Sequence, residues 1–205
     1  MFMRALVTGG AGFIGSHLVD RLVSRGDEVL VVDNLSSGVL EFIQGHIDSG
    51  AVDFHQVDLK DLDSLKPLLN GVDMVYHLAA NPDIRLGTRI TDTDLKEGTI
   101  ATYNVLESMR LANVEKIAFA SSSVVYGENA PMPTPENHGP CLPISLYGAS
   151  KQAGEGLIGF MGGNFWSASM DFQIRKHHWR ARNSWSYFRF HSQVESRSKS
   201  LGSLG

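Results

Sequence analysis

The sequence contains a single cysteine, Cys141, among its 205 residues. One cysteine excludes an internal disulfide framework and is typical of a reducing compartment, so we expect a cytoplasmic protein. No apolar run approaches the roughly 20 residues that a membrane-spanning helix needs, which argues against a membrane protein. The apolar start, MFMRALVTG, is short and leads directly into glycines that we expect in the mature protein, so it does not predict a signal peptide.

Basic residues are scarce in most of the chain and concentrated at its end. Residues 1–163 contain 11 Lys and Arg against 20 Asp and Glu, a net charge of −9, whereas residues 164–205 contain 7 against 2, a net charge of +5. All three tryptophans also lie in that last segment. Because two compositions meet near residue 163, we predict one folded domain over residues 1–162 and a different kind of segment over residues 163–205.

Apolar runs and helical patterns alternate over the first 162 residues, as expected of an α/β protein. Five short apolar runs predict buried strands: MRALVTG, DEVLVVD, AVDFHQVD, VDMVYHLAA and VEKIAFASSS. Helical spacing predicts helices at GSHLVDRLVSRG, LDSLKPLLNG, TDLKEGTIATYNVLESMRLAN and SLYGASKQAGEGLIGFM. The alternation predicts a doubly wound parallel sheet with helices on both faces. The proline-rich segment 128–145 is expected to be a loop over one end of the sheet, facing a substrate.

A glycine-rich turn, TGGAGFIG, stands between the first predicted strand and the first predicted helix. Gly9, Gly12 and Gly15 permit a tight turn and a close approach of the backbone to a pyrophosphate at the helix N-terminus. Asp33 follows Gly15 by 18 residues at the end of the second strand, where a carboxylate binds a ribose diol and repels a 2′-phosphate. The sequence therefore predicts a Rossmann-like NAD-binding domain. Its predicted cofactor-binding residues at this turn and at strand ends are Gly9, Gly12, Phe13, Ile14, Gly15, Asp33, Asn34, Ser37, Gly38, Asp58, Leu59, Leu78, Ala79 and Ala80. Of these, Asp58 and Leu59 are expected near the adenine.

A tyrosine and a lysine lie four residues apart in YGASK, on one face of a predicted helix. Tyrosine is a poor base at neutral pH, but a neighbouring Lys⁺ and an oxidised nicotinamide both favour the phenolate, which takes a proton from a substrate hydroxyl. Tyr147 and Lys151 are therefore candidates for both catalysis and cofactor binding. The serine cluster at 121–123 follows the fifth strand, at the edge where the topology places a ligand crevice.

These motifs, with DNLSSG, YNVLE and SSSVVYGE, resemble the extended short-chain dehydrogenase/reductases of the NAD-dependent sugar epimerase/dehydratase family, and most of all its UDP-glucose 4-epimerase branch. The resemblance covers residues 3 to about 160. It implies that Ser122 is the hydroxyl partner of Tyr147, with Ser123 as the neighbour that could share the role. It further implies that Asn104 steadies the active-site backbone and that helices 93–112 and 145–161 form a homodimer.

The same resemblance implies NAD-dependent epimerisation of a nucleotide sugar, of the UDP-glucose and UDP-galactose type, at C4. The resemblance implies that the family's dehydratases carry Thr-Asp-Glu at the positions where this chain has Ser122, Ser123 and Val124. Val124 cannot supply the carboxylate that elimination of water needs. Dehydration is therefore disfavoured. A one-way sugar reductase and a non-catalytic NAD-binding protein stay open as alternatives.

The basic segment MDFQIRKHHWRARNSW, residues 170–185, has several interpretations. A nucleic-acid-binding tail lacks a companion motif, and His177 and His178 lack further ligands for a metal, so we expect neither partner. A disordered extension replacing a missing substrate domain is a third interpretation. The favoured interpretation is that this segment is translated one nucleotide out of register. Codons shifted by one base permit the sequence WIFRFANIIGERG, which contains a strand that the resemblance requires after Lys151. We then expect impaired turnover.

Overall fold

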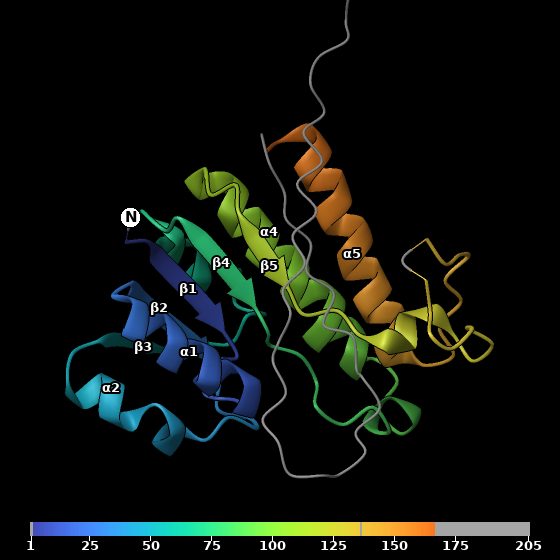
Figure 1. Ribbon diagram of the computed structural model, residues 1–205, viewed down its shortest axis with the longest axis horizontal. Coiled ribbons are helices and arrows are strands. Elements are labelled where there is room, and N and C mark those ends of the chain that lie inside the picture. Colours follow the sequence, from blue (N-terminus) through green and yellow to red (C-terminus); the bar gives the residue numbers. More distant parts are fainter. Residues whose placement is uncertain (1, 136, 167–205) are drawn as a thin grey trace, which may run out of the picture.

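Five parallel strands form one sheet in the computed structural model, which describes residues 2–135 and 137–166. The strand order is β3-β2-β1-β4-β5, so the first strand of the chain lies in the middle (Figure 1). All five predicted strands and the α/β fold are confirmed. The strands are β1 (Arg4–Thr8), β2 (Glu28–Asp33), β3 (Val52–Gln56), β4 (Met74–His77) and β5 (Ile117–Phe119).

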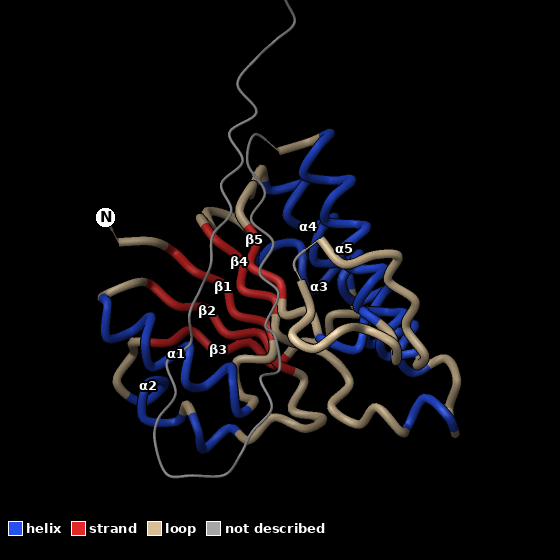
Figure 2. Tube along the Cα trace, turned by 45° about the vertical axis from the view of Figure 1, so that its right-hand side comes forward, coloured by secondary structure: helices blue, strands red, loops and turns tan. Residues whose placement is uncertain are grey.

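Helices cover both faces of the sheet, as Figures 1 and 2 show. The α-helices are α1 (Phe13–Arg25), α2 (Gln44–Asp48), α3 (Leu62–Leu65), α4 (Ala101–Ala112) and α5 (Leu146–Asn164). Short 3₁₀ turns occur at η1 (Leu40–Phe42), η2 (Lys66–Leu69), η3 (Leu86–Thr88) and η5 (Ser123–Tyr126), and η4 (Leu95–Ile100) is a π-helical turn that leads into α4. The predicted helix 93–112 therefore has π geometry over Leu95–Ile100, near its start, and the predicted helix 62–71 is a short α-turn followed by a 3₁₀ turn.

The two sides of β1 contribute to two separate cores, because successive side chains of a strand point to opposite faces. Ala5 and Val7 are buried with Val19 and Leu22 of α1. Leu6 is buried in the other core, which α3, α4 and α5 cover. Each face is therefore closed by apolar side chains, and the polar groups of the fold gather at the ends of the strands.

The C-terminal end of the described chain is part of the second core. Helix α5 continues to Asn164, past the predicted helix end, and Trp166 is buried against the same cluster as Met161. The segment 170–185, with the proposed register shift, lies outside the described residues. Within residues 2–135 and 137–166, no helix is long and apolar enough to cross a membrane.

Ligands of such sheets bind where the strand order reverses, outside the carboxyl ends of the strands. Here β1 pairs with β2 on one side and β4 on the other, so this point lies between the ends of β1 and β4. Thr8, at the end of β1, lies opposite His77 in the register with β4. The residues that follow these two strands therefore form the candidate site.

Candidate cofactor and catalytic site

The backbone of the turn between β1 and α1 lies so close to neighbouring backbone that Gly9 and Gly15 leave no room for a side chain. Gly9 has a φ of +69°, and a Cβ there would lie 2.8 Å from the backbone nitrogen of Ala79. A Cβ on Gly15 would lie 2.1 Å from the carbonyl oxygen of Gly9, so only glycine allows α1 to begin this close to the turn. The carboxyl ends of β1 and β4 and the start of α1 are thereby brought together.

The start of α1 has the properties that a pyrophosphate requires. Gly12 is also close to the turn, since a Cβ there would lie 3.2 Å from the Gly9 oxygen, a tight contact. The first turn of α1 contains no acidic residue, so the unpaired N–H groups and the positive helix end act undiminished on an anion. Phe13 and Ile14 are exposed on this turn. The geometry therefore fits the pyrophosphate of NAD.

Asp33 is held in place at the end of β2 by two backbone donors. The Ala11 N–H donates to its Oδ2 at 3.1 Å and the Leu35 N–H to its Oδ1 at 2.9 Å. Gly38 lies against the carboxylate, because a Cβ there would be 2.8 Å from Oδ1. Asn34 and Ser37 follow in the same loop. This fixed carboxylate suits a ribose diol and disfavours a 2′-phosphate, which fits NAD rather than NADP.

Polar contacts fix the segment after β3, where the adenine was predicted to bind. Burial alone would raise the pKa of Asp58, but hydrogen bonds from Lys60 and Asn34 outweigh it and lower that pKa. Lys60 also forms an ion pair with Glu97 of η4. The amide of Asn104 donates to the carbonyl oxygens of Leu59 and Lys60, at 2.8 and 3.2 Å. Asn104 therefore holds the backbone beside the predicted adenine site, and the hydrogen bonds of its amide nitrogen go to that backbone.

A fully buried histidine connects the ends of β1 and β4 to α4. The Nδ1 of His77 lies 2.7 Å from Thr8 Oγ1, its Nε2 lies 2.9 Å from Thr102 Oγ1, and the Ala79 N–H donates to the same Thr8 oxygen. Burial, aided by the charge of Lys151, lowers the pKa of His77 to about 3, so the ring is neutral. This network fixes the backbone at Leu78 and Ala79, and Leu78–Ala80 is therefore the candidate floor of the predicted cofactor site.

Tyr147, Lys151 and Ser122 come together at the end of β5. Figure 1 shows α5 alongside α4 and β5. The Lys151 ammonium lies 4.7 Å from the ring centre of Phe119 and 5.8 Å from that of Tyr147. Burial lowers the pKa of Lys151 to about 8. An ammonium that stays mostly protonated at neutral pH is thus held beside the phenol.

The phenol of Tyr147 is not yet activated in this arrangement. Burial and the charge of Asp94 raise its pKa, and the hydrogen bond with Ser122 only partly opposes them. The expectation that Lys151 alone favours the phenolate is therefore incomplete. A further positive charge close to the phenol would lower the pKa of Tyr147.

Sequence reasoning missed two acids beside this group. Asp94 is 1% exposed, accepts a hydrogen bond from Asn81 at 3.0 Å, and has no partner for its Oδ2 among the described residues. Glu155 accepts a hydrogen bond from Ser121. Glu155 follows Lys151 by four residues on the same helix, and that spacing was a readable signal. Asp94 carried no comparable pattern.

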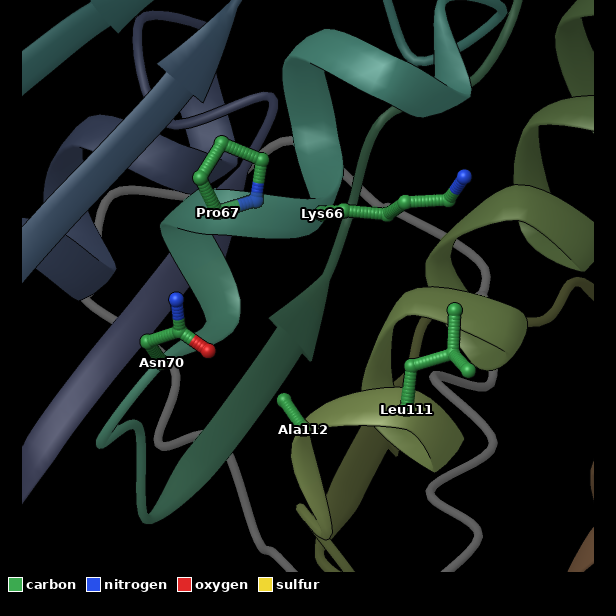
Figure 3. Close-up of a pocket in the computed structure, with 5 residues that line it drawn as sticks. All are labelled: Lys66, Pro67, Asn70, Leu111 and Ala112. Carbon is green, nitrogen blue, oxygen red and sulfur yellow. The ribbon is translucent and has the colours of Figure 1, made fainter.

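Two surface cavities lie away from the glycine-rich turn. One, of about 310 Å³, is bounded by the segment after α3 and the C-terminal end of α4 (Figure 3), and these segments shortly precede β4 and β5. Its lining residues are Lys66, Pro67, Asn70, Leu111 and Ala112. The other, of about 370 Å³, is lined in part by Ile84, Gly87 and Leu146, next to Tyr147. Of these two, the second is placed where a substrate of Tyr147 could extend.

Comparison with known proteins agrees with this geometry. Residues 5–162 match the NAD dependent epimerase/dehydratase family. The chain belongs to this family. A UDP-glucose 4-epimerase of Mycolicibacterium smegmatis is 38% identical over 160 residues, which are 75% of this chain and 49% of that protein. A UDP-galactose 4-epimerase of known structure is 48% identical, with a TM-score of 0.74 over 82% of this chain and 55% of that one.

A solved complex extends the comparison to the cofactor. The UDP-glucose 4-epimerase of Thermus thermophilus, solved with NAD, is 35% identical, with a TM-score of 0.71 over 84% of this chain and 54% of that one. Epimerases of this family are NAD-dependent, and NAD is the cofactor that the glycine-rich turn and Asp33 fit. The chain spans about half the length of the relatives it matches.

Proposed function

We propose that the chain takes part in NAD-dependent epimerisation of a UDP-hexose at C4. The observation that carries this proposal is the meeting of Tyr147, Lys151 and Ser122 beside the cradle that fits NAD. The named activities of the two relatives, on UDP-glucose and on UDP-galactose, support the substrate class.

Each residue of the group has a role that its surroundings support. Tyr147 takes the proton of the sugar 4-hydroxyl and later returns it, while Lys151 favours the phenolate by its charge. Ser122 holds the phenol through its hydrogen bond. NAD, held by the glycine-rich turn and Asp33, would supply a positively charged hydride acceptor for C4, and return of the hydride to the opposite face of the ketose would invert that carbon. The floor at Leu78–Ala80 and the carboxylate of Asp33 fix the position of the cofactor.

Dehydration is a related activity that the site supports less well. The turn after Ser122 presents Ser123 and Val124, and neither carries the carboxylate that elimination of water needs. Asp94 is a carboxylate near Tyr147, but it is 1% exposed and engaged by Asn81. Epimerisation, which needs one base and a cofactor that returns its hydride, fits the residues present.

Pairing of two copies through α4 and α5 belongs to the same proposal. Large apolar side chains are exposed along these helices and at the turn before α4: Leu95, Ile100, Tyr103, Leu111 and Phe160. Helices α4 and α5 lie against each other, so these exposed apolar side chains lie on two neighbouring elements and support an interaction surface there. We therefore propose a homodimer for the intact protein.

The activity is tested by incubating the 205-residue chain with NAD and either UDP-galactose or UDP-glucose, and separating the two sugars. We expect interconversion that is lost in Tyr147→Phe. A reductase would instead release NADH in proportion to the sugar consumed. Binding of NAD with neither sugar conversion nor NADH formation would contradict the proposal and indicate a non-catalytic NAD-binding protein.

A further inference from the structure

Helix α5 presents three functional groups at regular intervals. Lys151 follows Tyr147 by four residues, and Glu155 follows Lys151 by four, so all three lie toward one side of the helix. The contacts agree, since Lys151 lies over the ring of Phe119 at the end of β5 and Glu155 contacts Ser121 just beyond that strand. Glu155 therefore belongs to the same face as the proposed catalytic pair.

The contact of Glu155 fixes a short turn of backbone. The Ser121 hydroxyl donates to Glu155 Oε1, and Ser121 is 7% exposed. The Ser121 N–H donates to the carbonyl of Phe119 at 3.1 Å, and the Ala120 N–H donates to the carbonyl of His77 at 3.0 Å. Both the backbone and the side chain of Ser121 are thus held, the first by β5 and the second by α5.

Ser122 is the next residue after this fixed turn. Its backbone is extended, with φ −149° and ψ 150°, and the 3₁₀ turn η5 follows directly. The turn that begins at Ser122 lies against the start of α5, since a Cβ on Gly148 would be 3.1 Å from the carbonyl oxygen of Val124. Burial and Asp94 raise the pKa of the Tyr147 phenol, and hydrogen bonding with the Ser122 hydroxyl lowers it. A hydroxyl placed by an extended residue follows any displacement of the residue before it. A displacement of Ser121 would therefore move the Ser122 hydroxyl relative to the phenol.

Resting on the proposed function, we propose that Glu155 is a positioning residue: through the Ser121 hydroxyl it holds Ser122 at the phenol of Tyr147. Glu155 does not reach the reacting atoms in this role. It acts on them through two serines, and it anchors the end of β5 to the helix that carries the base.

The direction in which the pKa of Tyr147 changes when Glu155 is replaced distinguishes this positioning role from a direct electrostatic one. The groups that act on the phenol are Asp94, which raises its pKa, and Ser122, which lowers it, with the Lys151 ammonium on the same helix. Removing a carboxylate that acted directly would make the phenolate easier to form and lower the pKa of Tyr147. Removing a carboxylate that holds Ser122 in place would raise it, because the hydrogen bond to the phenolate is lost.

The experiment follows the ionisation of Tyr147 by NMR of the chain labelled with ¹³C at the tyrosine ring, with Tyr147→Phe to assign the signal. Glu155→Leu and Ser121→Ala should each move the Tyr147 midpoint to higher pH, by about threefold to tenfold in the ionisation constant, the effect of one hydrogen bond. Ser122→Ala should give the same rise, and Glu155→Leu should add nothing to it. Glu155→Gln keeps an acceptor oxygen and should restore most of the wild-type midpoint.

Glu107→Gln is the matched control, because that carboxylate pairs with Arg110 on α4 and should leave the midpoint unchanged. A midpoint that stays in place or falls in Glu155→Leu, or a rise that adds to that of Ser122→Ala, overturns the proposal. If Glu155→Leu fails to fold, the Tyr147 midpoints of Ser121→Ala and Glu155→Gln still test the proposal: the first should rise and the second should stay near the wild-type value. The titration needs neither substrate nor turnover, so an inactive chain would count against the proposed function alone.

Discussion

Burial of the Lys151 ammonium should reduce the stability of the fold, and replacing it by methionine should restore that stability. The residue is 3% exposed, and burial lowers its pKa from 10.5 to about 8. The difference of about 2.5 pH units corresponds, at about 1.36 kcal/mol per unit, to about 3 kcal/mol. Methionine keeps the length and apolar stem of lysine without the charge, so Lys151→Met should raise the free energy of unfolding by about 2–3 kcal/mol at neutral pH.

The pH dependence of this gain follows from the direction of the change. Below about pH 8 the lysine is protonated in both the folded and the unfolded chain, so the full cost of burying the charge is present. As the pH rises from about 8 to 10.5 the folded chain loses the proton first, and the cost disappears. Wild-type stability should therefore approach that of Lys151→Met over this range.

Denaturant unfolding of both chains at about pH 7 and near pH 10 measures the effect. Lys96→Met is the control, because the Lys96 ammonium is half exposed, pairs with Asp92 and should give no comparable gain. Equal stability of the wild type and Lys151→Met at neutral pH, or a gain of the same size in the alkaline sample, would refute the reasoning.

Two further predictions concern the cofactor cradle and the C-terminal segment. In Gly15→Ala the new Cβ would lie 2.1 Å from the Gly9 oxygen. The free energy of unfolding should therefore fall by about 1–3 kcal/mol, measured by thermal unfolding. The affinity for NAD should fall by about tenfold or more, measured by titration with NAD. Gly156→Ala, with no atom within 4 Å, should be neutral or slightly stabilising, and a similar result for Gly15→Ala would be inconsistent with the proposed close contact. If residues after about 163 are read out of register, sequencing the DNA through codons 155–170 should show a one-base slip. An unbroken frame without an overlapping continuation would exclude it.

The strands and the cofactor cradle were predictable because their signals are local. A buried parallel strand is a short apolar run, and Gly9 and Gly15 are required by backbone geometry within one turn of chain. The pairing of Tyr147 with Lys151 was predictable for the same reason, since four residues span one helical turn. These features need no knowledge of distant contacts.

The parts that were missed depend on contacts between segments far apart in the chain. His77 is connected to Thr8 and Thr102, 69 and 25 residues away, and its sequence context is only that of an ordinary strand. The π-helical turn η4 lies against α5, where a Cβ on Gly98 would be 2.5 Å from Ser150 Oγ. Periodicity predicts a helix there but not its geometry, because the packing partner decides it.

The state of the tyrosine shows a further limit. The sequence places a cation four residues from Tyr147 and so suggests an easily ionised phenol. The fold adds burial and the charge of Asp94, 53 residues earlier in the chain, and the net effect is a raised pKa. A balance of opposing environmental effects cannot be derived from spacing alone.

The candidate site has two halves, the glycine-rich cradle after β1 and the group of Ser122, Tyr147 and Lys151 near the end of β5. The position of β5 in the sheet makes these halves unequal in local stability. Within the described residues β1 is paired along its length on both sides, whereas β5 has three residues and pairs only with β4. Short strands with a partner on one side open more readily than central ones. The cradle therefore follows a central strand, whereas Ser122 follows a short strand that is paired on one side only within the described residues. A molecule that contacts both halves stabilises the closed arrangement by its own binding energy, so the chemistry is assembled most completely when the site is filled.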